Sequence, residues 1–93
     1  MIYSWLKDKK PKGVFLKKRR NENMLIVCSN DLNIFYLNKT ATFMLEHSDG
    51  RHSVEEIKQE MLDKYDVREH ELEDDLVEAL RDLQWRSLVV LEE

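Results

Sequence analysis

Apolar residues in the first part of the chain fall in short clusters that polar residues separate. Three of these clusters cover Val14–Arg20, Met24–Ser29 and Ile34–Leu37. They are rich in β-branched, aromatic and aliphatic side chains, which is typical of strands. Since Asn and Asp residues lie between the clusters, the pattern predicts three short strands in a meander or small antiparallel sheet.

The hydrophobic pattern becomes helical directly after the third cluster. Asn38 is a favoured N-cap residue, because its side-chain oxygen can accept an unpaired N–H of the first helical turn. Apolar residues follow it at helical spacing: Ala41, Met44 and Leu45. The pattern therefore predicts a strand that runs into a short helix without a loop, and Asp49-Gly50 marks the next turn.

Two longer amphipathic helices are predicted in the second half. Ser53 and Glu56 fit a capping box at the start of a helix over about 53–65. Its apolar stripe is Val54, Ile57, Met61, Leu62 and Tyr65. A second stripe predicts a helix over about 69–86: Leu72, Leu76, Leu80 and Leu83. Leu88–Leu91 is expected to form a last short strand or extended segment, so the fold class is α+β.

Three short helices followed by a strand are also typical of a winged helix-turn-helix, so nucleic-acid binding is an alternative function. The third helix would enter the DNA groove, yet between Glu69 and Gln84 it has seven acidic residues and one basic residue, Arg81. Phosphates would repel that surface. Only the basic N-terminal segment favours this alternative.

Length and charge divide the chain unevenly. Its 93 residues suit one domain with a single modest core. Residues 1–20 have eight Lys or Arg and one Asp, whereas residues 21–93 have seven basic and 18 acidic residues, so the balances of +7 and −11 give the net charge of −4. We expect residues 1–12 to form a basic flexible tail and residues 13–93 to form the domain.

Cysteine content and hydropathy predict a cytoplasmic protein. The single cysteine, Cys28, allows no intrachain disulfide. No apolar run has the length of a membrane span or of a secretory signal, so no membrane partner is expected.

No pattern indicates catalysis, a metal or a cofactor. The three histidines have no metal-ligand spacing with one another or with Cys28, and glycine-rich phosphate loops and nucleophile motifs are absent. The chain is therefore expected not to be an enzyme.

An ordered series of motifs resembles the PqqD-like family, whose members are RiPP recognition elements. The series is Leu37-Asn38-x-x-Ala41, Leu45, Asp49-Gly50, Ser53-Val54-Glu55-Glu56-Ile57, Asp75-Leu76-x-x-x-Leu80-x-x-Leu83 and Leu88-Val89. It extends over about residues 14–91. Two positions depart from the family pattern: Ser87 stands where glycine is common, and small Ala79 stands where larger apolar residues are frequent.

The resemblance implies a three-stranded antiparallel sheet packed on a three-helix winged helix-turn-helix unit. It also implies a function. Such domains hold the leader of a precursor peptide as an extra strand and present it to a modifying enzyme, often a radical S-adenosylmethionine (SAM) protein. The leader would lie beside the third strand and against the third helix. The implied binding residues are Asn33, Ile34, Phe35, Tyr36 and Leu37 on the strand, and Asp75, Leu76, Ala79, Asp82 and Leu83 on the helix.

Physical reasoning leaves some alternatives open. Ile34–Leu37 can be an edge strand with open backbone groups, but the chain's own tail or Leu88–Leu91 can also cover that edge. On the third helix, the flank with Ala79 is favoured over the flank with Val77, since a small residue leaves room for a guest side chain. A purely structural subunit of a larger enzyme is a further alternative, and the sequence does not define the oligomeric state.

Overall fold

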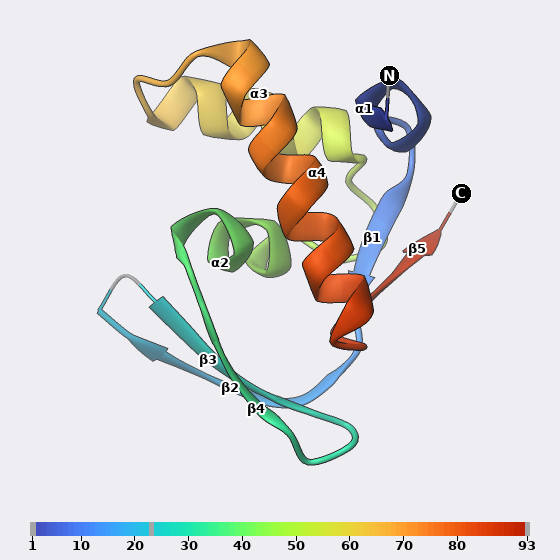
Figure 1. Cartoon of the computed structure of the whole chain (residues 1–93), viewed down its shortest axis with the longest axis vertical. Coiled ribbons are helices and arrows are strands. Elements are labelled where there is room, and N and C mark those ends of the chain that lie inside the picture. The colour runs from blue at the N-terminus through green and yellow to red at the C-terminus, as the bar shows by residue number, and fades with distance from the viewer. Residues whose placement is uncertain (1, 23, 93) are drawn as a thin grey trace.

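The computed structural model describes residues 2–22 and 24–92, and it is an α+β fold with two small antiparallel sheets (Figure 1). Its elements are α1 (Ile2–Leu6), β1 (Lys10–Gly13), β2 (Phe15–Asn21), β3 (Met24–Ser29), β4 (Ile34–Leu37), α2 (Lys39–Glu46), α3 (Val54–Lys64), α4 (Glu69–Trp85) and β5 (Val89–Glu92). One sheet has the strand order β2-β3-β4, and β1 pairs with β5 in the other. The predicted α+β class and three-stranded sheet are confirmed.

Strand alternation gives the three-stranded sheet one buried face. In the pairing of β3 with β4, Leu25 lies opposite Leu37 and Val27 lies opposite Phe35. Leu25, Val27 and Leu37 are each at most 1% exposed, because they pack beneath the helices. Ile34 and Tyr36 alternate with them and face away from the core.

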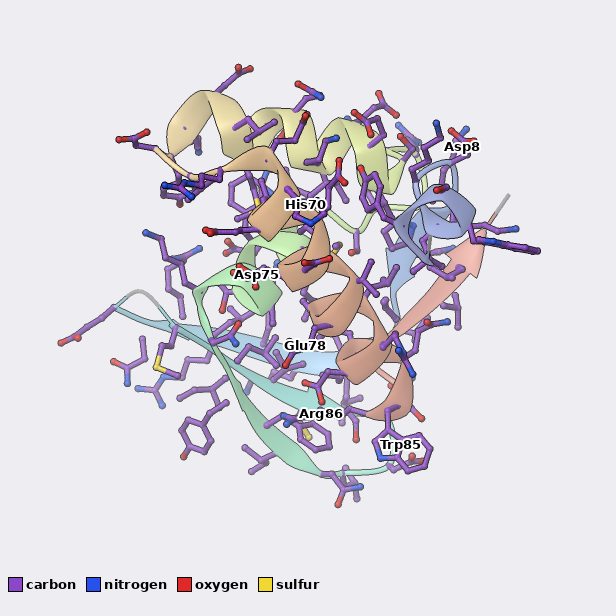
Figure 2. The ribbon with its side chains drawn as sticks, turned by 45° about the horizontal axis from the view of Figure 1, so that its top comes forward. Asp8, His70, Asp75, Glu78, Trp85 and Arg86 are labelled. Atoms are coloured by element: carbon purple, nitrogen blue, oxygen red, sulfur yellow. The ribbon has the colours of Figure 1, made fainter. Side chains whose placement is uncertain are left out.

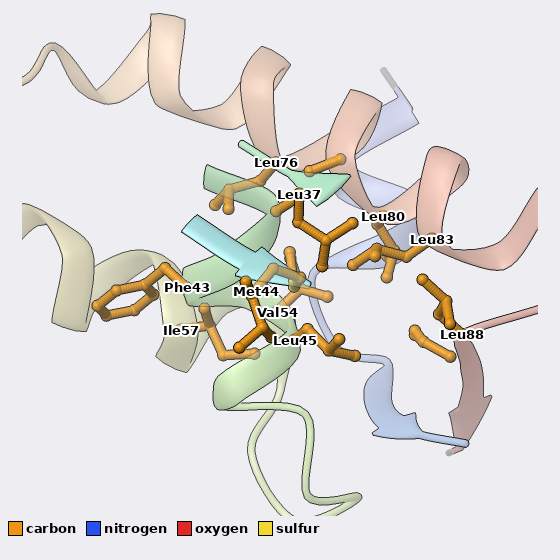
Figure 3. Packing of buried hydrophobic residues seen from close by; sticks show 14 of the residues in the cluster. Leu37, Phe43, Met44, Leu45, Val54, Ile57, Leu76, Leu80, Leu83 and Leu88 are labelled. Carbon is orange, nitrogen blue, oxygen red and sulfur yellow. The ribbon is translucent and has the colours of Figure 1, made fainter. Parts of the chain in front are cut away.

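The helix starts agree with the sequence patterns. The Asn38 Oδ1 accepts a hydrogen bond from the Ala41 N–H at 2.8 Å, so α2 begins directly after β4. Ser53 and Glu56 form both hydrogen bonds of the capping box at α3. The leucine stripe of α4 packs onto α2 and the sheet in one core (Figure 3). The core therefore fixes the position of α4 relative to β4.

The N-terminal segment differs from the predicted flexible tail. Residues 2–6 form α1, and β1 pairs with β5 so that Pro11 lies opposite Leu91. Pro11 is fully buried. The prediction was wrong here because the partner of β1 lies at the other end of the sequence, where a local pattern cannot indicate it. β1 and β5 therefore pair with each other and not with the edge strand β4.

A buried lysine attaches α1 and α4 to α3. The Lys58 side chain is 5% exposed, and its Nζ lies 2.9 to 3.2 Å from carboxylates of three glutamates: Glu55, Glu69 and Glu73. Burial disfavours the charged ammonium, but the hydrogen bonds to these carboxylates outweigh it and raise the pKa of Lys58. The Tyr3 hydroxyl donates to Glu55 at 2.7 Å. Burial and this hydrogen bond raise the Tyr3 pKa.

The C-terminal end of α4 is a left-handed turn at Ser87. Its φ of 59° is in the region that favours glycine. The Leu88 N–H donates to the Leu83 carbonyl at 2.9 Å, and the Ser87 N–H donates to the Gln84 carbonyl at 3.0 Å, which is a Schellman motif. Serine therefore adopts here the backbone conformation that glycine would adopt.

No helix in the described ranges 2–22 and 24–92 has both the length and the apolar character that a membrane span requires.

Candidate functional site

The candidate site begins with the backbone of β4, which is an edge strand. The Ser29 N–H donates to the Asn33 carbonyl at 2.9 Å and closes the β3–β4 hairpin. Hydrogen-bonded and non-bonded pairs alternate along an antiparallel ladder, so Val27–Phe35 is a bonded pair and Ile26–Tyr36 is not. The N–H and C=O groups of Ile34 and Tyr36 therefore point away from β3, toward the open edge.

The side chains of β4 divide between two environments. Ile34 and Tyr36 are 64% and 66% exposed on the outer face of the sheet. Phe35 lies half-buried on the helix side, and Leu37 is buried there. The Leu37 carbonyl also accepts a hydrogen bond from the Thr42 hydroxyl at 3.3 Å, which ties the end of the strand to α2.

A groove of about 390 Å³ lies between α4 and the start of α2. Its lining residues are Asn38, the N-cap of α2, with Thr40 and Ala41 from the first turn of α2, and Asp75, Glu78, Ala79 and Asp82 from α4. Figure 2 shows Asp75, Glu78 and Arg86 in order down α4, from α2 toward the three-stranded sheet. We call this cavity, which lies next to the edge of β4, the β4–α4 groove.

Charges are separated along the β4–α4 groove. The Arg86 guanidinium lies 4.9 Å from the centre of the Phe35 ring, and its Nε donates to Asp82 at 3.2 Å. Within the described ranges, the side chains of Asp75 and Glu78 form no hydrogen bond or ion pair. The end of the groove near Asn38 is therefore negative, whereas a guanidinium covers the end near Phe35.

The structure brings together some of the residues that the resemblance implied. Asp75, Ala79 and Asp82 line the cavity, and Ile34 and Tyr36 present the open edge beside it. This is the flank of α4 that the sequence analysis favoured.

Other implied residues lie elsewhere. The side chains of Leu37, Leu76 and Leu83 are at most 1% exposed and belong to the core, so they support the groove from beneath. Asn33 is exposed, but its N–H donates to the Ser29 hydroxyl at 3.2 Å and its carbonyl closes the hairpin. It contributes more to the turn than to the open edge.

Sequence reasoning missed some of the groove residues. Glu78 lies three residues after Asp75 and four before Asp82, and this helical spacing was a usable signal. Thr40 and Ala41 had no such signal, because their place in the groove depends on how α2 packs against α4. The contact of Arg86 with Phe35 likewise depends on tertiary packing.

Comparisons with known proteins agree with this architecture. The fold defines a class of small α+β domains that includes a solved structure described as TbiB1 in complex with the TbiA(beta) leader peptide. The TM-score is 0.70 at 18% sequence identity, and the match covers 82% of this chain and 93% of that chain. A comparison with curated proteins finds no match.

The family is shown by a match to a model over most of the chain. The model described as coenzyme PQQ synthesis protein D (PqqD) matches residues 24–89. The chain belongs to the PqqD family.

Proposed function

We propose that this chain binds the leader region of a ribosomally synthesised precursor peptide as an added strand along β4. It then presents the precursor to a modifying enzyme, which we propose is a radical SAM protein. The observation that carries the proposal is the open backbone edge at Ile34 and Tyr36 beside the β4–α4 groove. Membership of the PqqD family and the similarity to TbiB1, whose structure contains a leader peptide, support it.

The open edge supplies part of the binding free energy. Ile34 and Tyr36 together offer two N–H and two C=O groups, and each net hydrogen bond contributes about 1 kcal/mol. Four such bonds give about 4 kcal/mol, whereas a micromolar Kd requires about 8 kcal/mol. Side chains of the guest must supply the remainder, and the β4–α4 groove is the cavity next to this edge.

Proline substitutions test the added strand, because proline removes one backbone N–H. The probes are peptides selected by the full chain from a displayed library of random peptides. Tyr36→Pro removes an outward N–H, so we expect the variant to fold but no longer to bind the selected peptides. Phe35→Pro removes an N–H that faces β3, so we expect it to damage the fold. Titration calorimetry measures affinity, and circular dichroism measures folding.

The other edge of the sheet provides the matched control. Val27 directs its backbone groups toward β4, so the Lys18 opposite it on β2 has its N–H facing solvent. Lys18→Pro should therefore keep both the fold and the affinity. If Tyr36→Pro is folded and binds the selected peptides as the wild type does, strand addition at β4 is wrong.

A further inference from the structure

We infer that the β4–α4 groove selects the charge of its guest at two positions in register with β4. It accepts a lysine or arginine side chain opposite Leu37, and it disfavours a basic side chain opposite Phe35. This inference rests on the proposed function and specifies the class of peptide that the site takes.

The register follows from the pleat of the sheet. In paired strands, residues directly opposite each other project their side chains to the same face. Leu37 and Phe35 face the helices, so guest residues opposite them point toward α4. Guest residues opposite Tyr36 and Ile34 point to the outer face. Two guest positions, separated by one residue, therefore meet the side chains of α4.

The position opposite Leu37 meets the negative end of the groove. Asn38 follows Leu37 directly and lines the cavity together with Asp75 and Glu78. These two carboxylates lie three residues apart on one helix, where like charges destabilise each other. A guest cation would relieve that repulsion. Ala79, also in the lining, leaves room for the aliphatic stem of a long basic side chain.

The position opposite Phe35 meets a cation. Arg86 lies over the Phe35 ring and is held there by Asp82, whose charge it neutralises locally. A second basic side chain at this position would face the guanidinium. The charge preference therefore changes sign over two residues of the guest, and a general attraction between a basic peptide and an acidic protein would not produce that change.

The expected preference is moderate, because the carboxylates are open to water. Exposed ion pairs contribute about 0.2–1 kcal/mol each, so two of them correspond to a preference between about twofold and about thirtyfold for lysine over norleucine in the first position. Replacing that lysine by glutamate should weaken binding further.

Selection from the random peptide library tests the inference. We expect the wild-type chain to enrich Lys or Arg at one position and to deplete them two positions away. The double variant Asp75→Lys, Glu78→Lys should instead enrich Asp or Glu at the first position. The control Asp66→Lys, Asp74→Lys makes the same change in net charge outside the groove and should keep the wild-type preference.

Three outcomes would overturn the inference, and they differ in what else they imply. Peptides that require an intact Tyr36 N–H but show no positional charge preference overturn the charge selection alone. An equal change in preference in both double variants shows a general electrostatic effect and likewise overturns it. If no selected peptide is sensitive to Tyr36→Pro, the proposed function fails, and the inference fails with it.

Discussion

The two edges of the three-stranded sheet have opposite characters. β2 has four basic residues in succession from Lys17 to Arg20, and all four side chains are exposed. β4 lies on the other side of β3 (Figure 1). It exposes Ile34 and Tyr36 and lies beside the β4–α4 groove. Charged side chains protect an edge against pairing with another strand. One edge of this sheet is protected in this way, and the other is not.

The difference between the edges does not come from their backbones. Lys18 and Arg20 on β2 direct N–H and C=O groups to solvent, as Ile34 and Tyr36 do on β4. Both edges can form hydrogen bonds with a further strand. Side chains and neighbouring helices therefore decide which edge receives a guest.

Both edges of the sheet are expected to unfold together as one cooperative unit. Lys58→Met tests this expectation and has the largest expected effect. The variant leaves three glutamates without their buried partner, so we expect a loss of about 2 kcal/mol, less than for a fully buried pair because the carboxylates reach water. Folding raises the Lys58 pKa and lowers the Glu55 pKa, so the contribution is present while both groups are charged. It is lost as the pH rises from the unfolded lysine value of 10.5 through the raised folded pKa, and it weakens in acid as Glu55 is protonated.

Urea unfolding, followed through amide NMR signals of β2 and β4, measures this effect. Both strands should lose their signals at the same, lowered urea concentration. Lys64→Met, in an exposed part of the same helix, should leave the midpoint unchanged. Separate transitions for the two strands would show that the edges belong to different cooperative units.

A second test gives β4 the side chains of β2. Ile34→Lys with Tyr36→Lys should leave the fold intact, because both side chains are exposed. Binding of the selected peptides should weaken by about tenfold, since each lost cross-strand pair contributes roughly 0.2–1 kcal/mol. Calorimetry with Lys17→Thr, Arg19→Thr as the control, which alters only β2, decides the matter: equal losses in the two variants would contradict the distinction between the edges.

The smallest expected effect comes from Ser87→Gly. This substitution changes the end of α4, which lies next to β4 and not next to β2. Glycine adopts a positive φ without the steric penalty of a Cβ, so we expect a gain of about 1 kcal/mol and a higher Tm. A more stable C-terminal end of α4 should also keep Arg86 over the ring of Phe35 in β4. Thermal unfolding measures the gain, and an unchanged or lower Tm would mean that Ser87 is not strained.

Local patterns in the sequence predicted most of the fold. The Asn38 cap, the capping box at Ser53 and the leucine stripe of α4 each depend on residues close together in the chain, and the structure agrees with all three. The pairing of β1 with β5 was not predicted, because Lys-Pro-Lys-Gly has no strand pattern and its partner is distant in sequence.

The candidate site was predictable only in part, for a similar reason. Helical spacing placed Asp75, Ala79 and Asp82 on one flank of α4, and the structure places them in one cavity. Spacing could not distinguish Leu76 and Leu83, which lie in the core, from residues at the groove surface. The overlap of Arg86 with Phe35 required the packed arrangement of helix and strand.

The alternating hydrogen bonds of β4 also determine how fast its amide hydrogens exchange with solvent. Amide hydrogens exchange with solvent slowly where they are hydrogen-bonded and quickly where they are open. In the free protein, the amides of Phe35 and Leu37 should exchange slowly, whereas those of Ile34 and Tyr36, between and beside them, exchange quickly. A guest strand would slow the fast pair and leave the slow pair almost unchanged. The exchange rates of these four neighbouring amides therefore report whether a strand is bound, without any label on the peptide.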